Sequence, residues 1–418
     1  MNGHPQILPV RLQAEVINRI LRKRLDTILP AAMRAAGIDM WLILCQEDDY
    51  DPVFKTMIPM NTWAPILQML IFYDRGHGLA PERINLSMTD LGDLYERPWR
   101  GTSPDEQWKM LNHIIQERQP NQIGINVGSV QWAAGGLTQN LYSQLLNAIP
   151  PTYQERLVSA EKACEVWLMT LTADELELFV QVAKIAHWII SECFNPKSIT
   201  PGVTTTDDLE WTYWQLSVDL GLELSFKPFF RMIRRDSRKE TFPVEDKIIR
   251  RGDLLHCDVG IRYLRLNSDH QELAYVLQDG ETQAPEGFIR LLAEGNRLQK
   301  IFMDEFKAGL TGNQLLTNIL TSARSQGIPN PRVYSHSLGL FLHEPGPLIG
   351  LPWEQEKCPG RGDVALGTNS CFTMELAVED AVPEWDGQKV RLSLEQDVMF
   401  TPHGCQPIDG RQTQFHLI

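Results

Sequence analysis

Two aspartates in neighbouring apolar segments are the first residues of this sequence that could do chemistry. Asp258 interrupts the apolar residues 254–259, and Asp269 follows eleven positions later in a second such segment. An unpaired buried carboxylate is costly, so each must meet a partner group or a cation. A hairpin turning near Tyr263 and Leu264 would set the two carboxylates opposite each other, where they repel unless a cation lies between them. The alternative is that Asp258 caps a turn and Asp269 lies at the surface.

Two histidines lie in a segment that could contribute a nitrogen ligand, and a third could support a ligand. His336 and His343 are seven residues apart and flank a Leu-Gly-Leu sequence. Imidazole is the commonest neutral nitrogen ligand of divalent metals, although most single histidines are ordinary core or surface residues. His256 precedes Asp258 by two residues, so alternation along a strand points both side chains to one face. It could hydrogen-bond a metal ligand, but a satisfied core histidine is the commoner outcome.

Two glutamates complete the set. Glu375 and Glu395 each interrupt an apolar, strand-like segment. With the earlier residues they give the chain order Asp, Asp, His, Glu, Glu. An oxygen-rich site with one imidazole suits Mn²⁺, Fe²⁺, Co²⁺ or Zn²⁺, and four carboxylates carry enough negative charge for two such ions.

The elements that must position these residues change in character along the chain. The first 155 residues alternate between helical and strand-like patterns, which predicts a small α/β domain. Pro30 is expected to bend or split the first helix, and Gly37 to end it. Its predicted helices are 11–37 and 106–118, and its predicted strands are 40–44, 68–73 and 123–127.

The second half is predicted to be α+β, with acidic residues on its strands and helices covering them. A capping-box sequence at 172–175 starts the first helix after the boundary. The predicted domains are therefore 1–160 and 161–418. The second contains helices from 172, 205–220, 286–307 and 311–326, and strands 253–263, 269–277, 371–378 and 390–400.

Composition excludes several classes of protein. The 418 residues carry a formal net charge of −14 and show no basic stripe, so nucleic acid is not an expected partner. No apolar run approaches the roughly 18 residues that cross a bilayer, and no signal-peptide pattern begins the chain. We therefore expect no membrane partner and a cytoplasmic location. Seven scattered cysteines without a CxxC pair predict reduced thiols.

The order Asp-x-Gly, Ser-Asp, His-x-x-Gly, Glu, Glu resembles the pita-bread metallopeptidases, which include methionine aminopeptidases, Xaa-Pro aminopeptidases and prolidases. The resemblance covers about 160–418, and the first 155 residues resemble the N-terminal domain of prolidases and creatinases. It implies a pita-bread catalytic domain, a short peptide substrate and a homodimer. It also implies two divalent ions, with Mn²⁺ preferred over Co²⁺, Zn²⁺ or Fe²⁺, which would activate a water and polarise the scissile carbonyl.

The resemblance also assigns roles to individual residues. Asp269 and Glu395 would bridge the two ions. His343 would contact the substrate carbonyl or the tetrahedral intermediate, and Glu375 would handle the proton of the attacking water. The five implied metal ligands are Asp258, Asp269, His336, Glu375 and Glu395.

The substrate pocket departs from the family pattern at three positions. Arg332 and Thr241 stand where relatives usually carry histidines that bind the substrate's ends, and Ser393 replaces a frequent arginine. Arg332 suits a carboxylate because its guanidinium is a fixed cation with a forked donor face. We therefore expect Arg332, with Arg391 as second candidate, to bind the C-terminal carboxylate of a short substrate.

Three alternatives remain at this point. One is a hydrolase of the same fold that acts on a non-peptide C–N bond. Another is a metal-free enzyme like creatinase. The third is a non-catalytic pita-bread binding module, as in some chromatin and translation factors. The complete ligand set argues against the last two.

Overall fold

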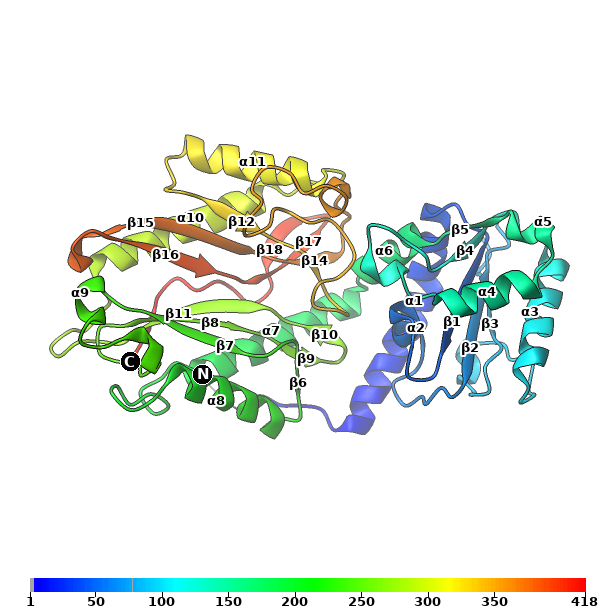
Figure 1. Ribbon diagram of the computed structural model, residues 1–418, viewed down its shortest axis with the longest axis horizontal. Helices are drawn as coiled ribbons and strands as arrows, with labels where there is room; N and C mark the ends of the chain where they lie inside the picture. Colours follow the sequence, from blue (N-terminus) through cyan, green and yellow to red (C-terminus); the bar gives the residue numbers. More distant parts are fainter. Residues whose placement is uncertain (1–3, 77) are drawn as a thin grey trace. The chain divides into compact units, whose positions relative to one another are not determined.

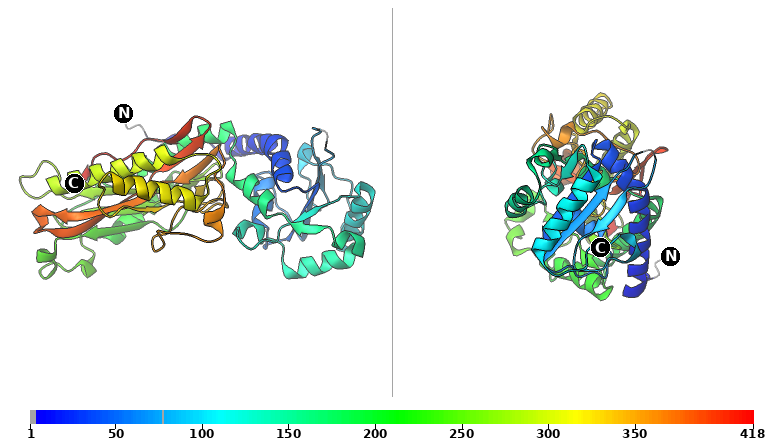
Figure 2. Two further views of the ribbon diagram at one scale, coloured as in Figure 1. Left: turned by 90° about the horizontal axis from the view of Figure 1, so that it is seen from above. Right: turned by 90° about the vertical axis from the view of Figure 1, so that its right-hand side faces the viewer.

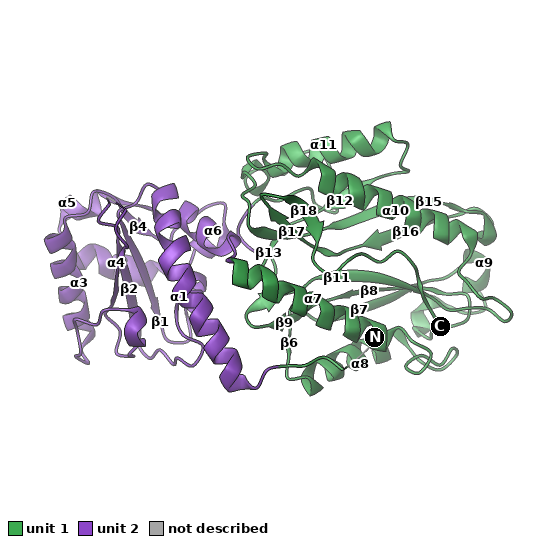
Figure 3. Cartoon of the chain, turned by 180° about the vertical axis from the view of Figure 1, so that it is seen from behind, with its two compact units in different colours: residues 1–7, 173–343, 347–418 green, residues 8–172, 344–346 purple. Residues whose placement is uncertain are grey.

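The computed structural model describes residues 4–76 and 78–418, and the chain divides into two compact units (Figure 3). Unit 1 comprises residues 1–7, 173–343 and 347–418, and unit 2 comprises residues 8–172 and 344–346. The division after Thr172 lies later than the predicted boundary at 160, because helix α6 (Glu161–Met169) packs against helix α1 (Val10–Ala35) of unit 2. The assignment of these units to the two domain types of the family stays a prediction.

Unit 2 has the predicted α/β character. Its five-stranded sheet has the order β3-β2-β1-β4-β5, with β1, β4 and β5 parallel. Helix α1 continues through Pro30, which was expected to bend or split it, because its buried face extends from Leu25 and Leu29 to Met33. The strands are β1 (Met40–Gln46), β2 (Leu67–Tyr73), β3 (Glu82–Asn85), β4 (Ile123–Ile125) and β5 (Leu157–Ser159); the other helices are α2 (Pro52–Met57), α3 (Pro104–Arg118), α4 (Gln139–Ala148) and α5 (Pro151–Gln154).

Unit 1 has the predicted α+β character and contains four sheets. Their strand orders are β19-β11-β8-β7, β12-β15-β16, β13-β14-β17-β18 and β10-β9-β6. The strands of the first sheet are β7 (Phe229–Ile233), β8 (Leu254–Val259), β11 (His270–Tyr275) and β19 (His416–Leu417). The second contains β12 (Arg332–Tyr334), β15 (Glu375–Val382) and β16 (Gln388–Leu394). The remaining strands are β13 (Ser337–Leu338), β14 (Ser370–Thr373), β17 (Asp397–Thr401), β18 (Gly404–Pro407), β6 (Glu223–Leu224), β9 (Ile261–Tyr263) and β10 (Leu266–Asn267).

Helices cover the outer faces of these sheets (Figure 1). Helix α10 (Glu286–Glu305) packs on β15 and β16, with α11 (Gly312–Ser325) beside it, and Figure 2 shows both helices lying across these strands. Helix α8 (Thr206–Asp219) packs on β7 and contacts α7 (Ala173–Cys193) on the opposite side of the unit. The short helix α9 (Asp236–Lys239) follows β7. One apolar core runs from α10 and α11 into the strands, and includes Phe288, Phe302, Ile319, Phe372 and Leu392.

Two composition-based predictions can be compared with the described residues. All seven cysteines have free thiols, as their scattered positions predicted, and six of them are buried. Within residues 4–76 and 78–418, every helix is too short or too polar to span a bilayer.

Candidate metal centre

A tight hairpin brings the two aspartates to one face of the first sheet. Its chain reverses over Leu264 and Arg265, which both adopt positive φ, close to the predicted turn. The hairpin needs a glycine at 260, since a Cβ there would lie 2.1 Å from the carbonyl oxygen of Ser268. This close approach explains the Asp-x-Gly sequence that begins with Asp258.

The strand register corrects one detail of the expected pairing. Gln271, and not Asp269, lies directly opposite Asp258 in the β8–β11 ladder. Asp269 lies two residues before Gln271, and side chains two apart on a strand share a face. The two aspartates are therefore diagonal neighbours on one face.

His336 meets this face from the connection between β12 and β13. Its imidazole is buried, and Nε2 lies 3.6 Å from Oδ2 of Asp269. Nδ1 lies 3.1 Å from the backbone carbonyl of Ser337, which can only accept, so Nδ1 carries the proton and Nε2 is the nitrogen that would bind a cation. Burial and the nearby His343 lower the pKa of His336 to about 3, so the ring is neutral.

The two glutamates come from the second sheet. Glu375 begins β15, and Glu395 occupies the connection between β16 and β17. Ligand-type atoms of Asp269, His336 and Glu395 all lie within 4.8 Å of one another. Asp258 and Glu375 are close enough for their charges to act on each other and on Asp269. The structure thus groups the ligand atoms of three of the five side chains that the sequence singled out, with Asp258 and Glu375 near enough to act on them through their charges.

Gln271 contacts a candidate ligand and was missed by the sequence analysis. Its side-chain amide donates to Oε2 of Glu395 at 2.8 Å, and its backbone forms an isolated bridge with the same glutamate. Its Oε1 lies 2.8 Å from Nε2 of His256. His256 is therefore a buried histidine that also orients Gln271, which in turn contacts the candidate ligand Glu395. The signal in the sequence was the spacing, since Gln271 follows Asp269 by two residues.

The electrostatics of the site call for cations. Burial raises the pKa of Asp258 to about 6 and that of Glu375 to about 7. Burial and the neighbouring carboxylates raise the pKa values of Asp269 and Glu395 well above their usual range. Among the described residues, Oδ1 of Asp269 and Oε1 of Glu395 are buried without a hydrogen-bond partner. Buried carboxylate oxygens that lack donors and repel one another fit divalent cations.

The predicted substrate residues lie around this group. The rings of His343 and His336 have centroids 4.3 Å apart. Arg332 and Arg391 line a small cavity together with Glu375, Tyr334 and Ser393. Thr241 lies exposed after α9 and does not line that cavity.

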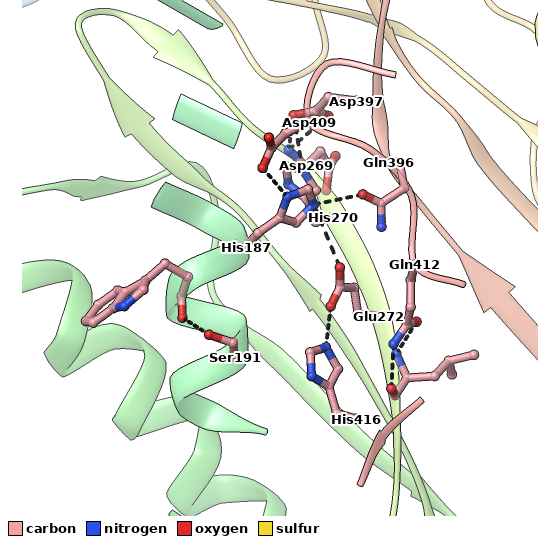
Figure 4. A network of polar contacts seen from close by, with 12 residues as sticks. His187, Ser191, Asp269, His270, Glu272, Gln396, Asp397, Asp409, Gln412 and His416 are labelled. Carbon is pink, nitrogen blue, oxygen red and sulfur yellow. Dashed lines mark hydrogen bonds and ion pairs between the residues drawn. The ribbon is translucent and has the colours of Figure 1, made fainter. Parts of the chain in front are cut away.

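A polar network supports the site from behind (Figure 4). Asp397 accepts a hydrogen bond from the backbone N–H of Asp269 at 3.3 Å. His187 of α7 donates from both ring nitrogens, to Oδ2 of Asp409 at 3.0 Å and to Oε1 of Gln396 at 2.8 Å. Burial disfavours its imidazolium, but the bond to Asp409 and the charge of Glu272 outweigh burial and raise the pKa of His187 to about 9. The network therefore holds a positive charge beside the strands that carry the candidate ligands.

Comparisons with known proteins give consistent results for family and fold. The model of metallopeptidase family M24 matches residues 177–402. An X-Pro aminopeptidase from Thermotoga maritima is similar in structure, with a TM-score of 0.65 and 17% identity over 93% of this chain and 100% of that one. An Xaa-Pro dipeptidase from Bacillus anthracis gives a TM-score of 0.62 and 17% identity, over 95% and 99%.

A third similar structure comes from a protein of another kind. The N-terminal domain of the FACT complex subunit SPT16 from Cicer arietinum gives a TM-score of 0.61 and 10% identity, over 96% of this chain and 99% of that one. No curated protein matches the sequence. Identities this low show the fold alone.

Substitution of Asp269 by alanine tests the cation site. The variant should bind far less Mn²⁺, measured by elemental analysis after metal loading and gel filtration. Without metal it should unfold no earlier than the parent protein, because the change removes a buried carboxylate that repels its neighbours. Asp279→Ala, at an exposed aspartate, is the matched control. Undiminished metal content in Asp269→Ala would contradict the site.

The His187 charge predicts a pH dependence of stability. A folded-state pKa of about 9, above the unfolded value near 6.5, stabilises the fold fully below pH 6.5, and this contribution is lost as pH rises through 9. A shift of this size corresponds to about 3 kcal/mol. The difference in unfolding free energy between wild type and His187→Gln should therefore shrink from pH 6 to pH 9.5 in urea titrations. An equal difference at both pH values would contradict a charged His187.

Proposed function

We propose that this chain, which belongs to metallopeptidase family M24 and is a metal-dependent peptidase, uses two divalent ions to hydrolyse short peptides of the Xaa-Pro type. The family model covers more than half of the chain, and the resemblance to the pita-bread metallopeptidases is confirmed with it. The observation that carries the proposal is the buried group of Asp269, His336 and Glu395, whose ligand-type atoms lie within 4.8 Å of one another, with two carboxylate oxygens that lack donors. Asp258 and Glu375 lie close enough for their charges to act on this group.

The donor set fits the proposed ions. Carboxylate oxygens with one imidazole suit first-row divalent metals, and the free Nε2 of His336 faces Asp269. We propose that Asp258, Asp269, His336, Glu375 and Glu395 would hold the ions. When bound, such ions supply a water of lowered pKa and polarise a carbonyl. The preference for Mn²⁺, the homodimer and the cytoplasmic location stay predictions.

Two residues are proposed to act on protons and on the reacting carbonyl. Glu375 is only half-buried and lines the cavity, so its carboxylate can reach a water and a substrate at once. His343 lies beside His336 and is exposed, so its ring can contact the substrate carbonyl.

The substrate preference rests on the cavity beside Glu375. Two arginines, Arg332 and Arg391, line it, and guanidinium groups bind carboxylates well. A short peptide whose carbonyl lies at Glu375 could place its C-terminal carboxylate against them. Similar structures include an X-Pro aminopeptidase and an Xaa-Pro dipeptidase, which supports proline in the second position.

A second candidate function is hydrolysis of a non-peptide C–N bond. It is favoured by the pocket positions that depart from the family pattern, since Thr241 lies outside the cavity and Ser393 replaces an arginine. A non-catalytic role, which the similarity to the SPT16 domain would suggest, does not explain a buried group of three ligand-type residues with two more carboxylates beside it.

A substrate panel tests the proposed peptidase activity. The metal-loaded protein should cleave an Xaa-Pro dipeptide with a kcat/KM above that for its C-terminal amide and for a longer Xaa-Pro peptide. Mn²⁺, Co²⁺ and Zn²⁺ should be compared in parallel, with chelated protein as the blank. If none of the three peptides is cleaved while metal is bound, the Xaa-Pro assignment fails and the non-peptide hydrolase becomes the better proposal.

Substitution of His343 by alanine separates catalysis from metal binding. Since His343 is proposed to contact the substrate and not the ions, the variant should keep its metal content. Its kcat should fall roughly 10²–10⁴-fold, the usual scale of general acid–base help. His336→Ala is the comparison and should lose metal as well as activity. Metal loss in His343→Ala would mean that the roles of the two histidines are reversed.

A further inference from the structure

Arg231 occupies the same face of the first sheet as the candidate metal ligands. It lies on β7 directly opposite His256 of β8, while Phe229 lies opposite Asp258. Side chains opposite each other in an antiparallel ladder share a face, so Arg231 projects to the side that carries Asp258. The sequence analysis did not single out this residue.

The guanidinium of Arg231 reaches across to the second sheet. Its Nη2 donates to Oγ of Ser393 at 3.4 Å, and Ser393 lines the cavity that contains Glu375 and Arg391. Asp258, Glu375 and Arg391 are all close enough for their charges to act on Arg231. The guanidinium therefore stands at the edge of the proposed substrate cavity.

Arg332 and Arg391 line this cavity, and Arg231 reaches its edge through Ser393. Of these three arginines, Arg231 makes the weakest contacts with other groups of the protein. Arg332 donates to the carbonyl of Pro352 at 2.6 Å, and Arg391 lies 3.6 Å from a carboxylate oxygen of Glu379. Arg231 makes one long bond to a hydroxyl, and among the described residues no carboxylate oxygen lies within 4.0 Å of it. Its donors are the ones best placed to bind a ligand.

The charge balance of the site points to an anion. If two divalent ions bind, they offset the four carboxylates. Arg391 then keeps Glu379 as its counter-charge at 3.6 Å, whereas the charge of Arg231 is left without one at the cavity. Two guanidinium groups repel each other unless an anion lies between them. A peptide carboxylate matches their forked donors.

We infer that Arg231, which reaches the edge of the cavity beside Ser393, binds the C-terminal carboxylate of the substrate and thereby selects peptides with a free C-terminus. This inference rests on the proposed function, because it names the group that recognises the end of the peptide. It moves the principal carboxylate contact from Arg332, the first candidate from the sequence, to a residue of the opposite sheet. Arg332 then shapes the cavity through the loop that contains Pro352.

The kinetic test compares alanyl-proline with its amide. Arg231→Met should raise KM for the free acid about 10- to 100-fold, the scale of a hydrogen bond between charged groups, and leave the amide and the metal content unchanged. Arg231→Lys keeps the charge but not the forked donors of the guanidinium, so its KM for the free acid should lie between those of wild type and Arg231→Met. Arg262→Met is the control, since Arg262 is an exposed arginine paired with Glu223 at 2.9 Å.

A binding test makes the inference independent of turnover. Proline and prolinamide are titrated calorimetrically into the metal-loaded protein, and proline should bind more tightly to wild type but not to Arg231→Met. The inference fails, and the peptidase proposal stands, if dipeptides are cleaved and Arg231→Met has the same kcat/KM as wild type for both the acid and the amide. It fails likewise if the variant loses activity on both substrates to the same extent. Loss of metal from Arg231→Met would overturn the inference, because it would mean that Arg231 balances the charge of Asp258 and does not bind the substrate. If no peptide is cleaved yet proline binding depends on Arg231, the inference stands and the peptidase proposal fails.

Discussion

The repulsion among four carboxylates crowded into one half of this chain is the constraint on which the rest of unit 1 depends. Burial raises the pKa values of all four, and two of their oxygens have no donor among the described residues. A fold that keeps such a group must gain something from it, because isolated buried charges are among the most costly features that a protein can carry. Divalent cations between the carboxylates would offset this repulsion.

The geometry of the two sheets is what keeps this arrangement in place. The hairpin from β8 to β11 supplies the aspartates, and the strands β15 to β17 supply the glutamates. Gln271 of β11 links the hairpin to the glutamate-bearing strands through its backbone bridge and its side-chain hydrogen bond to Glu395. Behind this junction, Asp397 fixes the backbone of Asp269, and the network around His187 ties α7 to the same strands. Two layers of polar contacts thus orient the candidate ligands before any ion arrives, which favours tight and selective binding.

Much of this could be predicted from the sequence because acidic residues inside apolar segments are rare and informative. Asp258, Asp269, Glu375 and Glu395 stood out for that reason, and the turn after Tyr263 followed from the hairpin they required. The register did not follow, because a pattern with a period of two fixes the face of a strand but not its partner. Gln271 and Arg231 were missed because neither an amide nor an arginine is unusual in a strand, and their importance appears only when two sheets meet. Helix α1 continued through Pro30 because tertiary packing outweighed a local preference.

The account depends most on two ions sharing the carboxylates of one site. The most direct measurement is electron paramagnetic resonance of the protein titrated with Mn²⁺, together with the number of ions bound per chain. Two Mn²⁺ per chain and a spectrum broadened by exchange coupling between neighbouring ions are predicted, because Asp269 and Glu395 would be shared between them. A single bound ion with the spectrum of isolated Mn²⁺, or no binding under any loading condition, would contradict the account.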